Sequence, residues 1–238
     1  MTKVLMIIPA YNEEGSIIKT TKSIEEFKNK VPFTLDYIVI NDGSTDKTKD
    51  LLVDNKIPAV HLVKNLGIGG AVQTGYLYAY YNDYDIAVQF DGDGQHDITS
   101  IEALVKPIVD GQADFTIGSR FVEGSPSEFK TSFSRRMGIN LISFFIKIKT
   151  GRRLLDVTSG YRAANREIIE YFSHHYPKKY PEPETNALLV KQNKRVEEIG
   201  VNMFERLEGK SSITPLKSIR YMIEVLTSII LLTTGRAK

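Results

Sequence analysis

The hydrophobic residues in the first half of the chain fall into short runs separated by longer amphipathic stretches. Each run is about five residues long and ends in Gly, Asp, Asn or Pro. This pattern is typical of strands buried in a sheet. The predicted strands lie within KVLMIIPA, DYIVINDG, AVHLVKN, DIAVQFDG and ADFTIGSR.

Several of the intervening stretches carry apolar residues three or four positions apart, which predicts helices. Thr45 and Ser100 are suitable N-caps for two of them. The alternation of strands and helices predicts an α/β fold with a single, Rossmann-like, mainly parallel sheet flanked by helices. The predicted helices are residues 16–28, 45–55, 70–81 and 100–110.

Unusual loops follow four of the predicted strands. In sheets of this type ligands bind beyond the carboxyl ends of the strands, and these ends share one edge. We therefore expect one binding site built from several loops. The loops are PAYNEE, NDGSTD, NLGIGG and DGDGQH.

The chain after Arg120 is less regular. Its tail, residues 213–238, places apolar residues at helical spacing but is interrupted by Lys217, Arg220 and Glu224. The apolar part is shorter than the ~20 residues that cross a bilayer. We expect a main domain of residues 1–212 and a C-terminal amphipathic helix that packs on the protein or lies on a membrane.

Composition and charge exclude several classes of protein. The net charge of +2, from 31 basic and 29 acidic residues, gives no electrostatic case for a nucleic-acid partner. The absence of cysteine excludes disulfides, thiolate zinc sites and a cysteine nucleophile. The first apolar run is too short for a signal peptide and turns acidic at Glu13, so a cytoplasmic protein is expected.

The segment VQFDGDGQHD presents acidic residues directly after a predicted strand. Asp91 and Asp93 offer hard oxygen ligands that suit Mg²⁺ or Mn²⁺, together with substrate phosphates and water. An ordinary Asp- and Gly-rich turn would look the same. A calcium loop is disfavoured, because His96 occupies the position of the required glycine.

Two glycine-rich segments invite misleading interpretations. GIGGAVQTG fails the dinucleotide fingerprint because its third glycine would be Val72. EGKSS fails as a phosphate-binding loop because the earlier glycine would be Phe204. The first segment still lets the backbone approach a ligand closely at a helix start, or simply makes a tight turn.

Seven motifs, taken in order, resemble the family-2 glycosyltransferases of GT-A fold, and most closely the polyprenyl-phosphate glycosyltransferases of the dolichyl-phosphate mannose synthase group. The resemblance covers roughly residues 3–212. The motifs are PAYNEE, NDGSTD, NLGIGGAVQTGY, DGDGQH, GSRF, DVTSGYR and ERLEGKSS.

The resemblance implies a role for each loop. The metal-binding DxD motif is Asp91 and Asp93, joined by Gln95, and the metal that it binds, together with arginine, neutralises the leaving diphosphate. Asp156 to Arg162 is expected to support the acceptor site. The implied nucleotide-binding residues are Pro9, Ala10, Tyr11, Glu13, Asp42, Gly69, Asp91 and Gly92. The implied catalytic residues are Asp93, Arg120, Arg136 and Arg206, with Arg135 and Lys210 at the acceptor phosphate.

The implied activity is inverting transfer of a sugar from a nucleoside diphosphate to polyprenyl (undecaprenyl) phosphate, for cell-surface polysaccharide. UDP-glucose or UDP-N-acetylglucosamine is favoured over GDP-mannose. Transfer to a saccharide or protein hydroxyl, for which Glu182 and Glu184 are the candidate bases, and sugar-nucleotide binding without turnover are the alternatives. We expect a peripheral protein on the inner face of the cell membrane, with a homo-oligomer left open.

Overall fold

The structure is a computed structural model that describes residues 1–125, 132–204 and 215–232, without the side chains of 215–219. Its described residues form one seven-stranded sheet in the order β3-β2-β1-β4-β6-β5-β7. All neighbouring pairs are parallel except those of β6, which runs antiparallel to β4 and β5. The strands are β1 (Lys3–Ala10), β2 (Thr34–Asn41), β3 (Ala59–His61), β4 (Ile86–Gln89), β5 (Phe115–Ser119), β6 (Arg162–Asn165) and β7 (Val196–Gly200).

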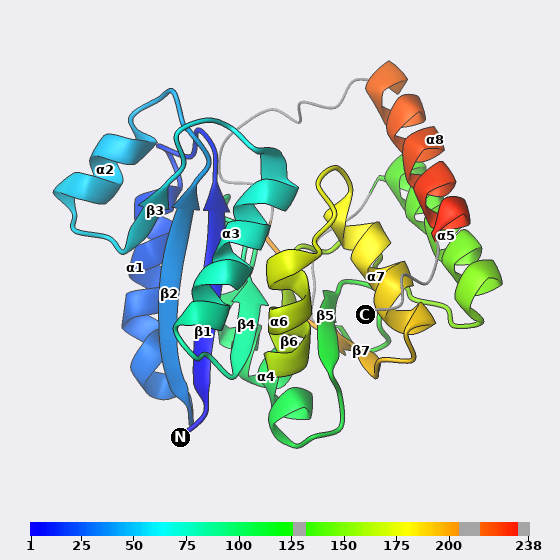
Figure 1. The fold of residues 1–238 in the computed structure, drawn as a ribbon, viewed down its shortest axis with the longest axis horizontal. Coiled ribbons are helices and arrows are strands. Elements are labelled where there is room, and N and C mark those ends of the chain that lie inside the picture. The colour runs from blue at the N-terminus through cyan, green and yellow to red at the C-terminus, as the bar shows by residue number, and fades with distance from the viewer. Residues whose placement is uncertain (126–131, 205–214, 233–238) are drawn as a thin grey trace.

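Helices cover both faces of this sheet (Figure 1). Two short 3₁₀ helices, η1 (Lys28–Lys30) and η2 (Ile98–Ser100), extend α1 and precede α4. The α-helices are α1 (Ile17–Phe27), α2 (Thr48–Asp54), α3 (Gly67–Tyr81), α4 (Ile101–Val109), α5 (Phe133–Thr150), α6 (Arg166–His174), α7 (Pro181–Lys191) and α8 (Pro215–Leu231).

Strand β1 shows how the sequence builds two cores. Its side chains alternate between the faces, as the two-residue period of a strand requires. Leu5 and Ile7 pack with α3 and α6 on one face, whereas Val4, Met6 and Ile8 pack with α1 and α4 on the other. The whole of β1 after Lys3 is buried, so it reads as a continuous apolar run.

The five predicted strands and four predicted helices of the first half are all present, with shifted ends. The N-cap prediction for Thr45 is wrong, because α2 begins three residues later and Thr45 bonds to Asn12 instead. Helix α3 begins at Gly67, three residues before the predicted start. Two strands of the irregular half, β6 and β7, were not predicted.

Helices α5 and α8 lie side by side at one edge of the molecule (Figure 1). Val225 and Ile229 of α8 are fully buried in the core that includes Ile142 and Ile146 of α5. The hydroxyl of Tyr180, which precedes α7, donates to Glu224 of α8. At least one face of the tail helix therefore packs on the protein.

Candidate active site

A pocket of about 440 Å³ lies where the parallel strands β1, β2 and β4 end. Its walls include all the predicted nucleotide-binding residues except Gly69. These are Pro9, Ala10, Tyr11, Glu13, Asp42, Asp91 and Gly92, with Asp93 of the predicted metal site beside them. Asn65, Gly67, Ile68, Ala71 and Glu182 complete the lining.

The loop after β1 is tied to the loop after β2 by reciprocal hydrogen bonds. The backbone N–H of Asn12 donates to Ser44 Oγ at 3.0 Å, and Asn12 Oδ1 accepts from the N–H of Thr45 at 2.8 Å. Next to it, the N–H of Glu13 donates to Thr48 Oγ1 at 2.8 Å. These bonds hold the pocket wall at Tyr11 and Glu13 in a fixed position relative to Asp42.

Asp42 is 3 % exposed and joins the second loop to the third. Its Oδ1 accepts from the N–H of Leu66 at 2.7 Å. Burial raises the pKa of this carboxyl, although the backbone N–H groups of Leu66 and Gly67 act against the rise. Gly43 beside it has φ +66° and lies so close to Asn65 that a Cβ would come within 2.8 Å of its backbone nitrogen. Only glycine fits this turn without strain.

The carboxylate of Asp91 is held at both oxygens. Gln89 Nε2 donates to Oδ1 at 3.4 Å, and His96 Nε2 lies 3.1 Å from Oδ2. Burial alone would raise the pKa of Asp91, but the bond to His96 and the donation from Gln89 bring it below its usual value. Asp93 is 7 % exposed, and its Oδ1 accepts from the N–H of Gln95 at 3.1 Å.

His96 and Gly160 belong to this site although the sequence did not single them out for it. The His96 ring is buried against Tyr161, with centroids 4.9 Å apart, and its Nδ1 has no hydrogen-bond partner. A Cβ on Gly160 would lie 2.3 Å from Asp91 Oδ2. Gly160 is thus needed at this position because any side chain would collide with the carboxylate of Asp91. The sequence could not reveal this contact, because the two residues lie 69 positions apart.

The donor chemistry fits a divalent cation held jointly with a substrate. Asp91 and Asp93 both line the pocket and offer carboxylate oxygens, which Mg²⁺ and Mn²⁺ prefer. Among the described residues no group of three or more His, Cys, Asp or Glu is arranged to hold a metal ion. A cation here would need oxygens of the bound diphosphate and water to complete its shell.

Two other predicted residues have structural contacts. Gln95 is engaged by the segment after β7: its Nε2 donates to the carbonyl of Phe204 at 3.4 Å, and its own carbonyl accepts from Phe204 N–H at 2.8 Å. Gly69 does not line the pocket. A Cβ there would lie 2.3 Å from the carbonyl oxygen of Pro177, so this glycine lets α3 pack against the chain before α7.

The predicted catalytic Arg120 forms a buried ion pair. Its Nε and Nη2 donate to the two oxygens of Asp156 at 2.8 and 2.7 Å, and its side chain is 5 % exposed. A third bond runs from its backbone N–H to Asp156 at 3.1 Å. Arg120 Nη2 also donates to Thr158 Oγ1 at 3.2 Å, so the guanidinium is held firmly by the segment that precedes β6.

The other predicted basic residues lie on α5 or outside the described residues. Arg136 stacks on Phe121, with its guanidinium carbon 3.5 Å from the ring centroid, and burial lowers its pKa. Arg135 is exposed one position earlier. Arg206 and Lys210 fall within residues 205–214 and are not described.

Of the two candidate bases, Glu182 lies in the pocket. It lies in the first turn of α7, its side chain is 19 % exposed, and its Oε1 is 4.0 Å from Arg162 Nη2. Burial raises the pKa of Glu182 and the negative charge of Asp91 adds to the rise, whereas Arg162 opposes it. Glu184 does not line the pocket, and burial raises its pKa.

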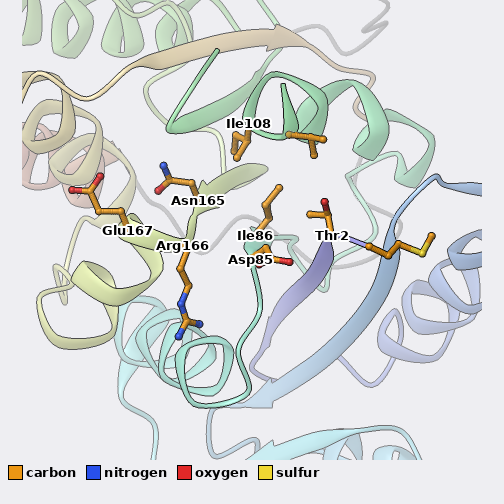
Figure 2. Close-up of a pocket in the computed structure, with 9 residues that line it drawn as sticks. Thr2, Asp85, Ile86, Ile108, Asn165, Arg166 and Glu167 are labelled. Carbon is orange, nitrogen blue, oxygen red and sulfur yellow. The ribbon is translucent and has the colours of Figure 1, made fainter. Parts of the chain in front are cut away.

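A second hollow, of about 520 Å³, opens near the amino ends of β1 and β4 (Figure 2). The polar side chains around it are used in local structure. Asp85 accepts from the N–H of Lys3 at 2.8 Å, and Asn165 caps α6. Arg166 turns away from the hollow, toward Tyr84 and Asp83. The chemistry is therefore at the opposite edge of the sheet.

The sequence profile described as Glycosyl transferase family 2 matches residues 6–172, which include all four strand-end loops and the three pocket aspartates. The chain belongs to this family. A relative from Methanococcus voltae, a UDP-N-acetylglucosamine–dolichyl-phosphate N-acetylglucosaminyltransferase, is 30 % identical over 80 % of this chain and 81 % of its own. An undecaprenyl-phosphate mannosyltransferase from Micrococcus luteus is 32 % identical over 70 % of this chain and 68 % of its own.

The architecture of this family-2 glycosyltransferase is the GT-A fold. It superposes with a TM-score of 0.70 on glucosyl-3-phosphoglycerate synthase from Mycobacterium tuberculosis, solved with Mn²⁺, UDP and phosphoglyceric acid. The match covers 98 % of this chain and 80 % of that one at 20 % identity. No helix within the described residues of the family-2 glycosyltransferase is long and apolar enough to span a bilayer.

Loss of the buried ion pair between Arg120 and Asp156 is expected to destabilise the protein strongly. Changing Asp156→Asn keeps the shape of the side chain but leaves the Arg120 guanidinium without its counter-charge, which is expected to lower the free energy of unfolding by about 3 kcal/mol. Urea denaturation of the two proteins measures the difference. Asp110→Asn, which breaks the exposed Lys106 pair, is the control and should change stability little. Equal stability of the Asp156→Asn and wild-type proteins would show that the pair does not hold this region together.

Proposed function

We propose that this enzyme transfers a sugar from a nucleoside diphosphate to a polyprenyl phosphate. The observation that carries the proposal is the pocket at the strand ends, where Asp91 and Asp93 lie beside the predicted nucleoside-binding residues. The names of the two relatives support a lipid-phosphate acceptor. The Methanococcus relative, which aligns with more of the chain, favours a UDP-sugar such as UDP-N-acetylglucosamine, with UDP-glucose next.

The proposed reaction is a single displacement at the anomeric carbon. A phosphate oxygen of the acceptor forms the new bond to that carbon from the face opposite the nucleotide. The bond to the nucleoside diphosphate breaks, and the diphosphate leaves with the electron pair, so the configuration inverts. Asp91 and Asp93 would hold a Mg²⁺ or Mn²⁺ ion, which supplies neutralisation of the charge that develops on the leaving group.

The acceptor explains why several arginines are expected in the site. A phosphate monoester is already anionic near neutral pH, so it needs orientation and charge balance rather than a base that removes a proton. Guanidinium groups bind phosphate through two parallel hydrogen bonds. Arg135 or Arg136 on α5, with Arg206 and Lys210, are proposed for this role, and Arg120, held by Asp156, is proposed to add positive charge near the reacting phosphates.

An exposed apolar stripe on α5 supports contact with the membrane that contains such an acceptor. The stripe is Phe133, Met137, Leu141, Phe144 and Ile148, at helical spacing and 42–85 % exposed. Helix α5 has no acidic residue, and Lys147, Lys149, Arg152 and Arg153 are exposed at its C-terminal end. Apolar side chains flanked by basic residues suit the interface of an anionic bilayer.

Together these features outline the proposed organisation. Residues 1–212 would form the catalytic domain, and residues 213–238 the helical extension that packs beside the membrane-facing α5. The enzyme would act as a peripheral protein on the inner face of the cell membrane, where nucleotide sugars are made. The product would then serve synthesis of a cell-surface polysaccharide.

A donor panel tests the proposed reaction. The protein is expected to transfer label from a UDP-sugar to polyprenyl phosphate in the presence of Mn²⁺ or Mg²⁺, and to transfer little from GDP-mannose. Asp93→Ala should lower turnover on the order of 10²-fold or more, because the diphosphate would lose its alignment. Thin-layer chromatography of extracted lipid measures the product. Full activity in excess EDTA, or of the Asp93→Ala variant, would exclude the metal role.

The acceptor chemistry makes a separate prediction at Glu182. Glu182→Gln should cost at most about tenfold in turnover with polyprenyl phosphate, far less than Asp93→Ala, because no proton has to be removed from the acceptor. Steady-state rates from pH 6 to 9 provide the measurement, and Glu184→Gln, outside the pocket, is the control. If Glu182→Gln binds donor normally yet is as inactive as Asp93→Ala, Glu182 acts as a base, and a hydroxyl acceptor becomes the better proposal.

Membrane contact is tested by changing the surface of α5. Phe144→Gln combined with Ile148→Gln removes two exposed apolar side chains and should weaken binding to phosphatidylglycerol vesicles on the order of tenfold. Co-sedimentation measures the bound fraction. The matched control combines Val53→Gln with Val63→Gln, which changes two exposed valines that are distant from α5 in the sequence. Equal binding by all three proteins would rule out the stripe as a membrane contact.

A further inference from the structure

A buried glutamine lies beneath the pocket, two residues before Asp91. Gln89 ends β4 and is 0 % exposed. In the antiparallel pairing of β4 with β6 it faces Arg162, which is also fully buried. Neither side chain lines the pocket, and the proposed reaction gives neither of them a role.

The neighbours of Gln89 determine which way its amide points. A guanidinium has donors and no acceptor, so the amide oxygen must face it. Accordingly Gln89 Oε1 accepts from Arg162 Nη2 at 2.6 Å and lies 3.4 Å from the hydroxyl of Tyr176. The NH₂ group of Gln89 is thereby turned to the opposite side, toward the pocket.

This NH₂ group bonds to a pocket carboxylate, because Gln89 Nε2 donates to Asp91 Oδ1 at 3.4 Å. The carboxylate of Glu182, in the first turn of α7, lies nearby, with its Oε1 4.0 Å from Arg162 Nη2, the nitrogen that donates to Gln89. The two carboxylates repel each other, so a donor bonded to Asp91 helps to hold that side chain against the repulsion.

We propose that Gln89 is a positioning residue that holds Asp91 in place at the floor of the pocket. Arg162 orients the amide, and the amide orients the carboxylate of Asp91. Because Asp91 is a proposed ligand of the cation and diphosphate, this inference rests on the proposed function. It adds a buried support that neither the family resemblance nor the pocket lining indicates.

Two substitutions distinguish a role of Gln89 in positioning Asp91 from a role limited to accepting a hydrogen bond from Arg162. Gln89→Met removes the acceptor and the donors without changing charge. Gln89→Glu keeps an acceptor for Arg162 but removes both donors; it is assayed at pH 8, where a carboxylate that accepts from a guanidinium is ionised. If positioning is the role, both variants lose turnover on the order of tenfold or more. If Gln89 serves only as a hydrogen-bond acceptor for Arg162, Gln89→Glu keeps the wild-type rate, and the proposal is overturned.

Nucleotide binding provides a readout that does not need turnover. Isothermal titration calorimetry of UDP, and of GDP in parallel, with and without Mn²⁺ gives the factor by which the cation tightens binding. We expect Gln89→Met to bind the nucleotide alone within about twofold of wild type, and to lose at least tenfold of the cation's effect, because Asp91 is no longer held in place. An unchanged cation effect in a folded Gln89→Met protein would also overturn the proposal.

The control is Gln73→Met, which removes an amide that donates to the carbonyl of Ser173 at 3.2 Å between α3 and α6. It should leave the cation effect unchanged, whatever it does to the melting temperature. If no lipid product forms in the donor panel but the cation effect is present in wild type and lost in Gln89→Met, the proposed acceptor is wrong and the positioning role stands.

Discussion

The guanidinium of Arg162, buried in the middle of the sheet, is the charge on which the floor of the site depends. An isolated charge in a protein interior is very costly unless it is paired and hydrogen-bonded. Arg162 meets this demand with Gln89 of β4, Thr185 of α7 and Tyr176 before α7, at 2.6 to 2.7 Å. Although burial would lower its pKa, Tyr176 and Glu182 raise it above the usual value, so the group stays charged. Arg162 of β6 thereby links α7 to β4, the strand that leads into the DxD motif.

Most of the fold's first half follows from local patterns, whereas the second half does not. Strands β1, β4 and β5 are apolar runs because helices cover them on both sides. Strand β6 is only four residues long and begins with Arg162, which no periodicity marks as buried. Strand β7 reads VEEIG and is half-buried at the sheet edge. Both become strands through long-range pairing with β5, so the sequence pattern alone could not reveal them.

The candidate site, too, could be predicted from the sequence only in part. The loops that follow β1, β2 and β4 could be assigned to one pocket because parallel strands end together. The partner of Arg120 could not be assigned, because the arginine matches a phosphate-binding motif while Asp156 lies 36 residues away. Gly69 likewise looked like a ligand contact but meets the backbone of Pro177. A motif identifies the residue types of a site; three-dimensional neighbours decide which of them face the substrate.

The charge of the pocket gives a physical reason for its proposed ligands. Its described lining contains five carboxylates, those of Glu13, Asp42, Asp91, Asp93 and Glu182, and no lysine or arginine. Such a surface repels a nucleoside diphosphate, and the raised pKa values of Asp42 and Glu182 show how costly burial makes their charged forms. A divalent cation between the carboxylates and the diphosphate would turn repulsion into attraction, and basic residues reaching in from α5 would balance the acceptor phosphate. The acidic lining is therefore a reason to expect a cation to accompany the donor.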